Sequence, residues 1–285
     1  MASSNVAVVF RNVHFRYDAK SPEVLTDVSV EIPTGMFVAV IGQNGGGKTT
    51  FAKHINGLLK PTAGSVSVYG TDTRERRSDP LSHLVGYCYQ NPDHQIFSAT
   101  VRAEVAFGPT SLGLPIAEVE RRTHEAMELV DLTAKAQVHP SLLGRGERQR
   151  LAVASVLAMG AEILVVDEPT TGLDYQRVTR IMKLLDDWNQ RLGRTIIVIT
   201  HDIRTVADYV PYTIIMAQGQ VRYFGATRAA LLQDDALDAA AVTPPQTVRV
   251  ARALSSLGVP SDLVTVSDLV EALRQKVPLG RAQSM

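Results

Sequence analysis

Residues 42–49 read Gly-Gln-Asn-Gly-Gly-Gly-Lys-Thr and match the pattern G-x-x-x-x-G-K-[ST]. The apolar run Phe37–Ile41 precedes them, and a sequence that favours a helix from about Thr49 to Leu59 follows. Glycines allow backbone N–H groups to surround phosphates, and the N-terminus of the next helix adds partial positive charge. A glycine-rich turn with a surface lysine is the alternative, but the strand–loop–helix order disfavours it. The motif therefore predicts a phosphate-binding loop in an α/β fold.

This loop defines the candidate ATP-binding residues. Lys48 is expected to reach the phosphates, and the hydroxyl of Thr49 is expected to ligate Mg²⁺. Tyr17, an aromatic residue ahead of the loop, is a candidate platform for the adenine ring, with a core tyrosine as the alternative reading. The full set is Tyr17, Gly42, Asn44, Gly45, Gly46, Gly47, Lys48, Thr49 and Thr50.

Two adjacent carboxylates follow another apolar strand. The run Ile163–Val166 ends in Asp167 and Glu168. At the end of a buried strand, Asp167 can face the Mg²⁺ shell and Glu168 can face an attacking water molecule. Such strand ends are often structural when they occur alone. The phosphate-binding loop earlier in the chain favours the catalytic interpretation.

Gln90 and His201 also follow predicted strands, Leu84–Tyr89 and Thr195–Thr200. Ligands of open α/β sheets bind at the carboxyl edge, where both residues are expected to lie. We expect His201 to sense the γ-phosphate and Gln90 to touch Mg²⁺ or the attacking water. A surface histidine without such a role is the alternative for His201.

Strand patterns alternate with helical patterns between residues 37 and 200, which predicts a mainly parallel sheet covered on both faces. Residues 6–41 read as short strands, whereas residues 93–160 are more polar and helical. Beyond residue 233, an acidic and alanine-rich link leads to two short amphipathic helical patterns. We therefore expect a domain at 1–233, with a helical subdomain at about 91–160, and a small extension at 234–285.

Composition narrows the class of protein. The formal net charge is zero, which argues against a chain that coats nucleic acid. Cys88 is the single cysteine, so no disulfide forms within the chain. The longest apolar runs are far shorter than the roughly 20 residues of a membrane helix. In a membrane process, another chain is expected to supply the membrane part.

In this order, these motifs resemble an ATP-binding-cassette ATPase from residue 6 to about 230. The resemblance includes Pro169–Asp174, Thr200–Asp202 and Leu143–Glu147, which stands where the family has its L-S-G-G-Q signature. It implies a P-loop NTPase core with an N-terminal antiparallel β subdomain, an inserted helical subdomain and a small C-terminal helical extension. It also implies a head-to-tail dimer with ATP and Mg²⁺ between the loop of one subunit and the signature of the other. The implied signature residues are Gly144, Arg145, Gly146 and Glu147, with Asp174 at the dimer interface.

The stretch from Gln90 to Val101, followed by Phe107–Pro109, resembles the energy-coupling-factor type, the importers of vitamins and of cobalt or nickel ions. That resemblance implies a second ATPase subunit, an integral membrane coupling protein and a substrate-binding membrane protein as partners, and no nucleic acid. It also implies a peripheral position at the cytoplasmic face of the cell membrane. Asn91–Val101 is expected to contact the membrane partner, and the C-terminal extension is expected to support dimerisation.

The signature departs from the family pattern, since Gly144 replaces serine and Arg145 replaces the first glycine. We therefore favour a heterodimer with a paralogue over a homodimer, with unequal ATP sites. Arg145 acting as an arginine finger is an alternative.

Other classes of protein are also considered. A non-transport relative in DNA repair or on the ribosome, another importer subclass, and a nucleotide binder without hydrolysis are the alternatives. The stretch from Gln90 to Leu143 leaves no room for the long coiled coil of repair relatives. The transported substrate is not indicated by the sequence.

Overall fold

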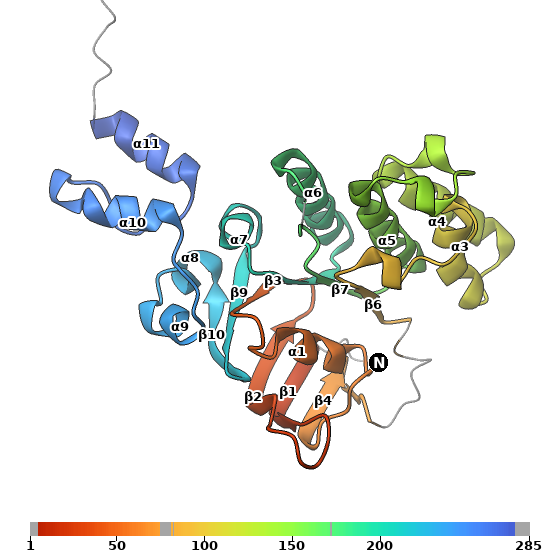
Figure 1. The fold of residues 1–285 in the computed structure, drawn as a ribbon, viewed down its shortest axis with the longest axis horizontal. Coiled ribbons are helices and arrows are strands. Elements are labelled where there is room, and N and C mark those ends of the chain that lie inside the picture. The colour runs from red at the N-terminus through yellow and green to blue at the C-terminus, as the bar shows by residue number, and fades with distance from the viewer. Residues whose placement is uncertain (1–4, 75–80, 82, 172, 277–285) are drawn as a thin grey trace, which may run out of the picture.

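The computed structural model describes residues 5–74, 81, 83–171 and 173–276. Gly172 of the quoted motif and the last residues of the extension, 277–285, lie outside the described part. Within it, the chain forms two sheets with helices between and around them (Figure 1).

The smaller sheet is antiparallel and has the strand order β2-β1-β4-β5. Its strands are β1 (Val6–Phe15), β2 (Leu25–Pro33), β4 (Ala63–Val68) and β5 (Thr71–Asp72). Where the sequence predicts only short strands, β1 continues for ten residues and contains a bulge, since Asn12 has a φ of +45° and the register shifts between Phe10 and Val13. This bulge absorbs the polar interruption without ending the strand.

The larger sheet has the strand order β10-β9-β3-β8-β7-β6. Its strands are β3 (Phe37–Ile41), β6 (Val85–Cys88), β7 (Ile163–Asp167), β8 (Thr195–Ile199), β9 (Tyr212–Ala217) and β10 (Gln220–Ala226). All neighbouring pairs are parallel except β9 with β10. The predicted mainly parallel sheet is thus confirmed.

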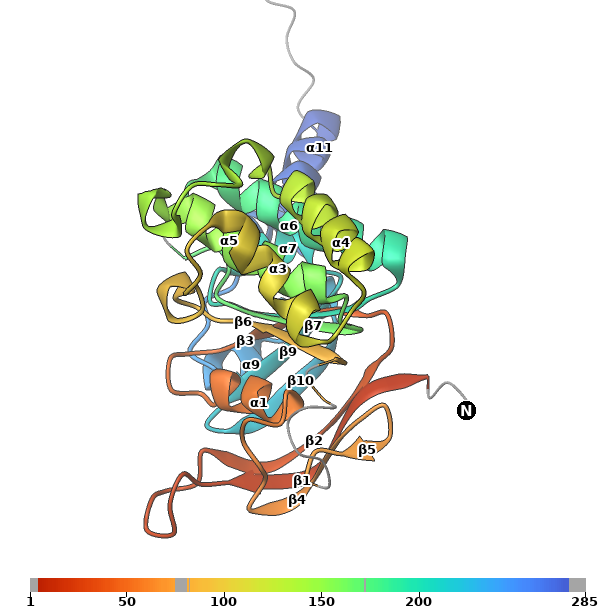
Figure 2. The ribbon, with the colours of Figure 1, turned by 90° about the vertical axis from the view of Figure 1, so that its right-hand side faces the viewer.

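Both faces of this sheet are buried, as the uniformly apolar strands require. In β3, Val38 and Val40 join a core with the antiparallel sheet and with α1 (Lys48–Ile55). Phe37, Ala39 and Ile41 join the opposite core, which the other helices build. Figure 2 shows α1 between the two sheets and the helical layer on the far side of the larger sheet.

The helical layer has two parts. An inserted helical subdomain contains α3 (Val101–Ser111), α4 (Ile116–Leu129) and α5 (Arg145–Met159), with the short 3-10 helices η1 (Pro92–His94), η2 (Thr133–Lys135) and η3 (Pro140–Leu142). The other part contains α6 (Tyr175–Leu192) and α7 (Ile203–Tyr209). This arrangement places the inserted subdomain beside β6 and β7 (Figure 1). Strand β7 ends in Asp167, and Gln90 follows β6.

One part of the C-terminal region packs on the main domain, and the other part forms a separate small core. It contains α8 (Thr227–Ala230), α9 (Asp234–Ala239), α10 (Gln246–Ala253), η4 (Ser255–Leu257) and α11 (Val266–Lys276). Leu237 and Ala240 are buried in the main core, whereas Ala251, Val259 and Leu263 form a small core of their own. The boundary at residue 233 therefore stays a prediction, because the first part of the proposed extension packs on the main domain. Among the described helices, none has the length and apolar character needed to cross a bilayer.

Candidate functional site

The phosphate-binding loop connects β3 to α1, as its sequence predicts. Gly42 has a φ of +148°, and a Cβ there would lie 2.1 Å from the carbonyl oxygen of Met216. No other residue type fits this position without moving the backbone. At the end of the loop, Gly47 caps α1 with a φ of +97°, which turns the loop into the helix.

Lys48 is buried within this loop. Its ammonium group donates to the carbonyl oxygens of Gly42 and Gln43, at 2.8 and 2.9 Å. Burial lowers the pKa of Lys48, while attraction to Glu168 and Asp167 opposes that shift. The positive charge of Lys48 is thus held at the phosphate-binding loop, where it can attract a phosphate.

Asp167 ends β7 beside the loop. Its Oδ2 accepts hydrogen bonds from the hydroxyls of Thr49, at 3.1 Å, and of Tyr87, at 3.0 Å. Burial raises the pKa of Asp167, although both hydrogen bonds and Lys48 act in the opposite direction. Tyr87 is a site residue that the sequence analysis does not single out.

Glu168 is nearly buried and has a φ of +50°, which is unusual for a residue other than glycine. Its Oε1 lies 2.7 Å from Nδ1 of His201, whose side chain is 62% exposed. The hydroxyls of Thr171 and Thr200 donate to Oε2 at 3.3 and 3.4 Å. Strained backbone at a carboxylate held in this way is typical of functional sites.

These elements enclose one polar pocket of about 170 Å³. It is lined by Val24, Asn44, Gly45, Gly47, Lys48, Thr49, Thr50, Gln90, Asp167, Glu168 and Ile199. Tyr17 adjoins it, since its hydroxyl lies 3.1 Å from Oγ1 of Thr50 and its ring is 59% exposed. An exposed aromatic side chain beside this pocket is suited to stack on an aromatic base. The structure therefore brings together the residues proposed for ATP binding and for catalysis.

The oxygen donors at this pocket fit Mg²⁺. Asp167 supplies a carboxylate, Thr49 a hydroxyl and Gln90 an amide oxygen on the rim. Mg²⁺ prefers oxygen ligands and usually binds through one or two carboxylates together with phosphates and water. Within the described ranges, no cluster of three His, Cys, Asp or Glu residues is placed to hold a metal ion without a substrate.

The signature residues lie elsewhere. Gly144 is the N-cap of α5, and its N–H donates to Oε2 of Glu147 at 3.0 Å. Gly146 packs against the side chain of Arg177. A second pocket of about 490 Å³ is lined by Gly144, Arg145, Gly146, Glu147, Arg150, Asp174, Gln176, Arg177 and Arg180. It shares no residue with the phosphate pocket, so the signature does not complete the site of its own subunit.

A third hollow, which we call the docking groove, has a volume of about 320 Å³. It is lined by Asn56, Leu58, Val85, Gly86, Tyr87, Tyr89, Gln95, Phe97, Glu104, Phe107, Gly108, Ser155, Val156 and Met159. Phe97 and Phe107 are 66% and 50% exposed, and their rings meet edge to face at 4.7 Å. The buried carboxylate of Glu104 accepts the N–H groups of Phe97 and Ser98, at 3.1 and 2.8 Å, which fixes this loop. Ile96, the residue before Phe97, packs against the core instead and is only partly exposed.

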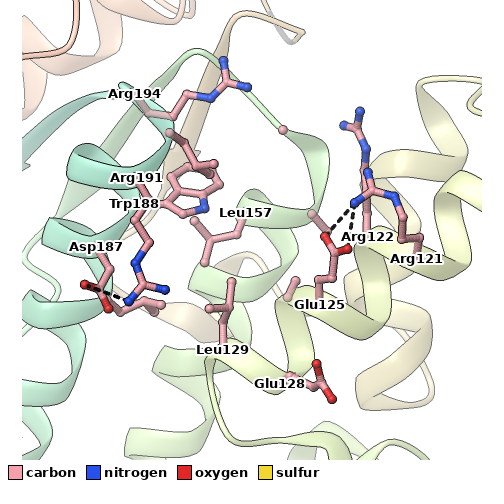
Figure 3. A pocket seen from close by; sticks show the side chains of 15 residues that line it. Arg121, Arg122, Glu125, Glu128, Leu129, Leu157, Asp187, Trp188, Arg191 and Arg194 are labelled. Atoms are coloured by element: carbon pink, nitrogen blue, oxygen red, sulfur yellow. Dashed lines mark hydrogen bonds and ion pairs between the residues drawn. The ribbon is translucent and has the colours of Figure 1, made fainter.

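A larger groove, of about 640 Å³, separates α4 and α5 from α6 (Figure 3). Leu129, Leu157 and Trp188 line it, and Arg121 beside it is paired with Glu118 and Glu125. It contains neither the loop nor the carboxylates of β7. Size alone therefore does not identify the nucleotide site.

Comparisons with known proteins agree with this geometry. Residues 25–171 match the family model described as ABC transporter. The chain is 39% identical to the energy-coupling factor transporter ATP-binding protein EcfA1 of Symbiobacterium thermophilum, over 95% of this chain and 98% of that protein. It is 42% identical to an ABC transporter ATP-binding protein of Caldanaerobacter subterraneus over 88% of its own length, but spans only 44% of that longer relative.

A solved structure gives a similar result. The structure of CbiO1 from Clostridium perfringens, described as part of the ABC transporter complex CbiONQ, superposes with a TM-score of 0.76 and 30% identity. The superposition covers 90% of this chain and 98% of the other.

Proposed function

This chain belongs to the energy-coupling factor transporter ATP-binding proteins of the ABC transporter family, and we propose that it binds and hydrolyses ATP to power the import of a micronutrient. Vitamins or transition-metal ions are the substrate class that fits this subfamily. The observation that carries the proposal is the single pocket in which the phosphate-binding loop, Asp167 and Glu168 converge.

The residues of this pocket have different roles in binding and hydrolysis. The loop amides and Lys48 bind the phosphates, and Tyr17 stacks on the adenine. Asp167, Thr49 and Gln90 hold Mg²⁺, which neutralises charge on the phosphates when it is bound. Glu168 accepts a proton from the attacking water, and His201, 2.7 Å from its Oε1, orients that carboxylate and reaches toward the γ-phosphate.

A second ATPase subunit completes each site. The separate signature pocket supports this arrangement, because four arginines and two acidic residues line it and its net charge suits an anion. In a head-to-tail dimer, Gly144–Glu147 of one subunit face the ATP of the other, and Asp174 lies at the interface. We favour a paralogous partner, since Gly144 offers no hydroxyl to the phosphate.

The docking groove supports a membrane partner. It combines exposed Phe97 and Phe107 with a rigid loop directly after Gln90. Exposed aromatic pairs in a groove favour contact with another protein. We propose that an integral membrane coupling protein inserts there, with a substrate-binding membrane protein beside it and this chain at the cytoplasmic face of the membrane.

This function can be tested by measuring nucleotide binding and hydrolysis. Both are measured on the purified chain alone and on the complex that copurifies from its native membrane. We expect magnesium-dependent ATP hydrolysis, and loss of ATP binding in Lys48→Ala. Lys183→Ala, an exposed lysine on α6, is the matched control and is expected to behave as wild type. Full ATP binding by Lys48→Ala would contradict the assignment of the pocket.

A further inference from the structure

Tyr87 contributes to two sites, the phosphate pocket and the docking groove. Its hydroxyl donates to Oδ2 of Asp167 at 3.0 Å, at the phosphate pocket. Its ring lines the docking groove next to Tyr89, and the centroids of these two rings are 5.0 Å apart. The side chain therefore contacts the proposed metal ligand at one end and the proposed partner surface along its ring.

The backbone at Tyr87 is held firmly. β6 is the edge strand of the larger sheet, and its parallel pairing with β7 places Tyr87 opposite Val165. On its other side, Gly86 lies so close to α5 that a Cβ would come within 2.3 Å of Val156 Cγ1. With the strand fixed by β7 and α5, the phenol can move only by rotation of the Tyr87 side chain, which packs against the core and lines the docking groove.

The hydrogen bond from Tyr87 has a specific use at Asp167. Oδ2 accepts from two hydroxyls, and one of them, Thr49, is itself expected to ligate the metal. If the hydroxyl of Thr49 ligates the metal, Tyr87 would be the hydroxyl donor that still holds Oδ2 of Asp167. Groups that orient a metal ligand in this way contribute strongly to metal affinity.

We propose that Tyr87 is a positioning residue that orients Asp167 for Mg²⁺ and transmits occupancy of the docking groove to that carboxylate. A partner seated against the Phe97–Phe107 pair shares the groove with Tyr87, so contact with the Tyr87 ring would move its hydroxyl relative to Asp167. This inference rests on the proposed function, since it requires a magnesium nucleotide at the pocket.

Tyr87→Phe removes the hydroxyl and keeps the ring. Its matched control is Tyr89→Phe, which changes the neighbouring ring of the same groove but not a donor to Asp167. We would measure the Mg²⁺ affinity of the full chain bound to a non-hydrolysable ATP analogue by calorimetry, and the affinity for the analogue without Mg²⁺. Tyr87→Phe is expected to weaken Mg²⁺ binding by about 10- to 100-fold and to leave metal-free analogue binding unchanged. Tyr89→Phe is expected to match wild type in both.

The outcomes separate the inference from the proposed function. If the wild-type chain binds no magnesium nucleotide, the proposed function fails. If wild type binds it and Tyr87→Phe retains full Mg²⁺ affinity, the positioning role is overturned. Loss of analogue binding without Mg²⁺ in Tyr87→Phe would mean a structural role and would also overturn it.

A second experiment tests whether occupancy of the docking groove is transmitted to Asp167. It uses the complex copurified from the native membrane. The Mg²⁺ concentration for half-maximal hydrolysis is expected to differ between the complex and the lone chain, in wild type and in Tyr89→Phe. In Tyr87→Phe this difference is expected to vanish. Equal values in wild type, or a difference that survives in Tyr87→Phe, would overturn the transmission.

Discussion

At the residue scale, Asp167 combines burial with a negative charge. Removing a carboxylate from water disfavours its charged form, so burial raises its pKa above the usual value for aspartate, despite hydrogen bonds from Tyr87 and Thr49. A carboxyl group whose pKa is higher in the folded than in the unfolded state stabilises the fold at low pH. That contribution is lost as pH rises through the folded-state pKa. The charged form of Asp167, the proposed magnesium ligand, thus lowers the stability of the fold at neutral pH when no cation is bound.

Asp167→Asn should therefore raise the free energy of unfolding at pH 7 in the absence of nucleotide and Mg²⁺, because the amide carries no charge to bury. The gain should shrink as pH falls through the folded-state pKa of Asp167, and it should vanish when the carboxyl is protonated in both states. Urea unfolding at a series of pH values measures this difference. A variant less stable than wild type at pH 7, or an advantage that grows toward low pH, would contradict the argument.

Some residues of the candidate site can be predicted from the sequence and others cannot. The loop, Asp167, Glu168 and His201 follow from strand ends, because parallel strands bring their carboxyl ends to one edge. Tyr87 does not follow, since its hydroxyl contacts Asp167 only through the pairing of β6 with β7. The signal present in the sequence is a tyrosine on the strand that leads to Gln90. A tyrosine at such a position can equally be a core residue, so the sequence does not distinguish the two roles.

At the element scale, the predictable parts are those with a strong local pattern. β3, β7 and β8 are short apolar runs and lie where the sequence predicts them. The hairpin of β9 and β10 is not predicted, although Gln218 and Gly219 at its turn both have positive φ, which is typical of tight hairpins. Helix α1 ends at Ile55, earlier than the expected Leu59, since Gly57 at φ +73° turns the chain away.

The docking groove yields a prediction at this scale. Phe97→Glu places a charge on an exposed aromatic position that belongs to no part of the phosphate pocket. It should reduce recovery of the membrane partner by at least about tenfold, the factor that corresponds to roughly 1.4 kcal/mol of binding free energy, and leave ATP binding unchanged. Quantitative copurification and nucleotide titration measure the two effects.

Ile116→Glu is the matched control for this experiment. Ile116 is 83% exposed at the start of α4, in the same subdomain, and does not line the groove. It should retain both the partner and ATP. Wild-type recovery of the partner by Phe97→Glu, or equal losses in both variants, would contradict a contact at the groove.

At the scale of the whole molecule, the phosphate pocket and the signature pocket occupy separate places on one subunit. This separation follows from the topology, because the signature begins α5 of the inserted subdomain while the loop lies between β3 and α1. The proposed dimer joins the two kinds of pocket. In such a dimer, a change in the signature is expected to affect the ATP site of the partner and not that of its own subunit.

Gly144→Ser tests this relation. A Cβ at Gly144 would meet only Oε2 of Glu147, at 3.7 Å, so a serine fits. Restoring a hydroxyl donor should raise turnover of the lone chain, by up to the 10²–10³-fold typical of one donor to transition-state charge. Gly144→Ala, which adds the carbon without the hydroxyl, should give no gain. Fast hydrolysis by the unmodified lone chain, unimproved by serine, would show that the altered signature carries no penalty.

The central claim is that Glu168 is the base of an ATP-dependent dimer. Glu168→Gln keeps the shape of the side chain and removes the proton acceptor, so ATP should remain bound and turnover should fall by about 10²- to 10⁴-fold. Bound ATP should then hold the two subunits together by binding linkage. Glu162→Gln, a surface glutamate paired with Arg194, should behave as wild type.

The decisive measurement is light scattering coupled to size exclusion, with hydrolysis recorded on the same samples of the complex and the chain. The account predicts that ATP raises the dimer fraction of the Glu168→Gln chain, that this fraction falls when ATP is removed, and that the variant does not turn over. Near-normal turnover by Glu168→Gln, with no ATP-dependent dimer, would contradict the account.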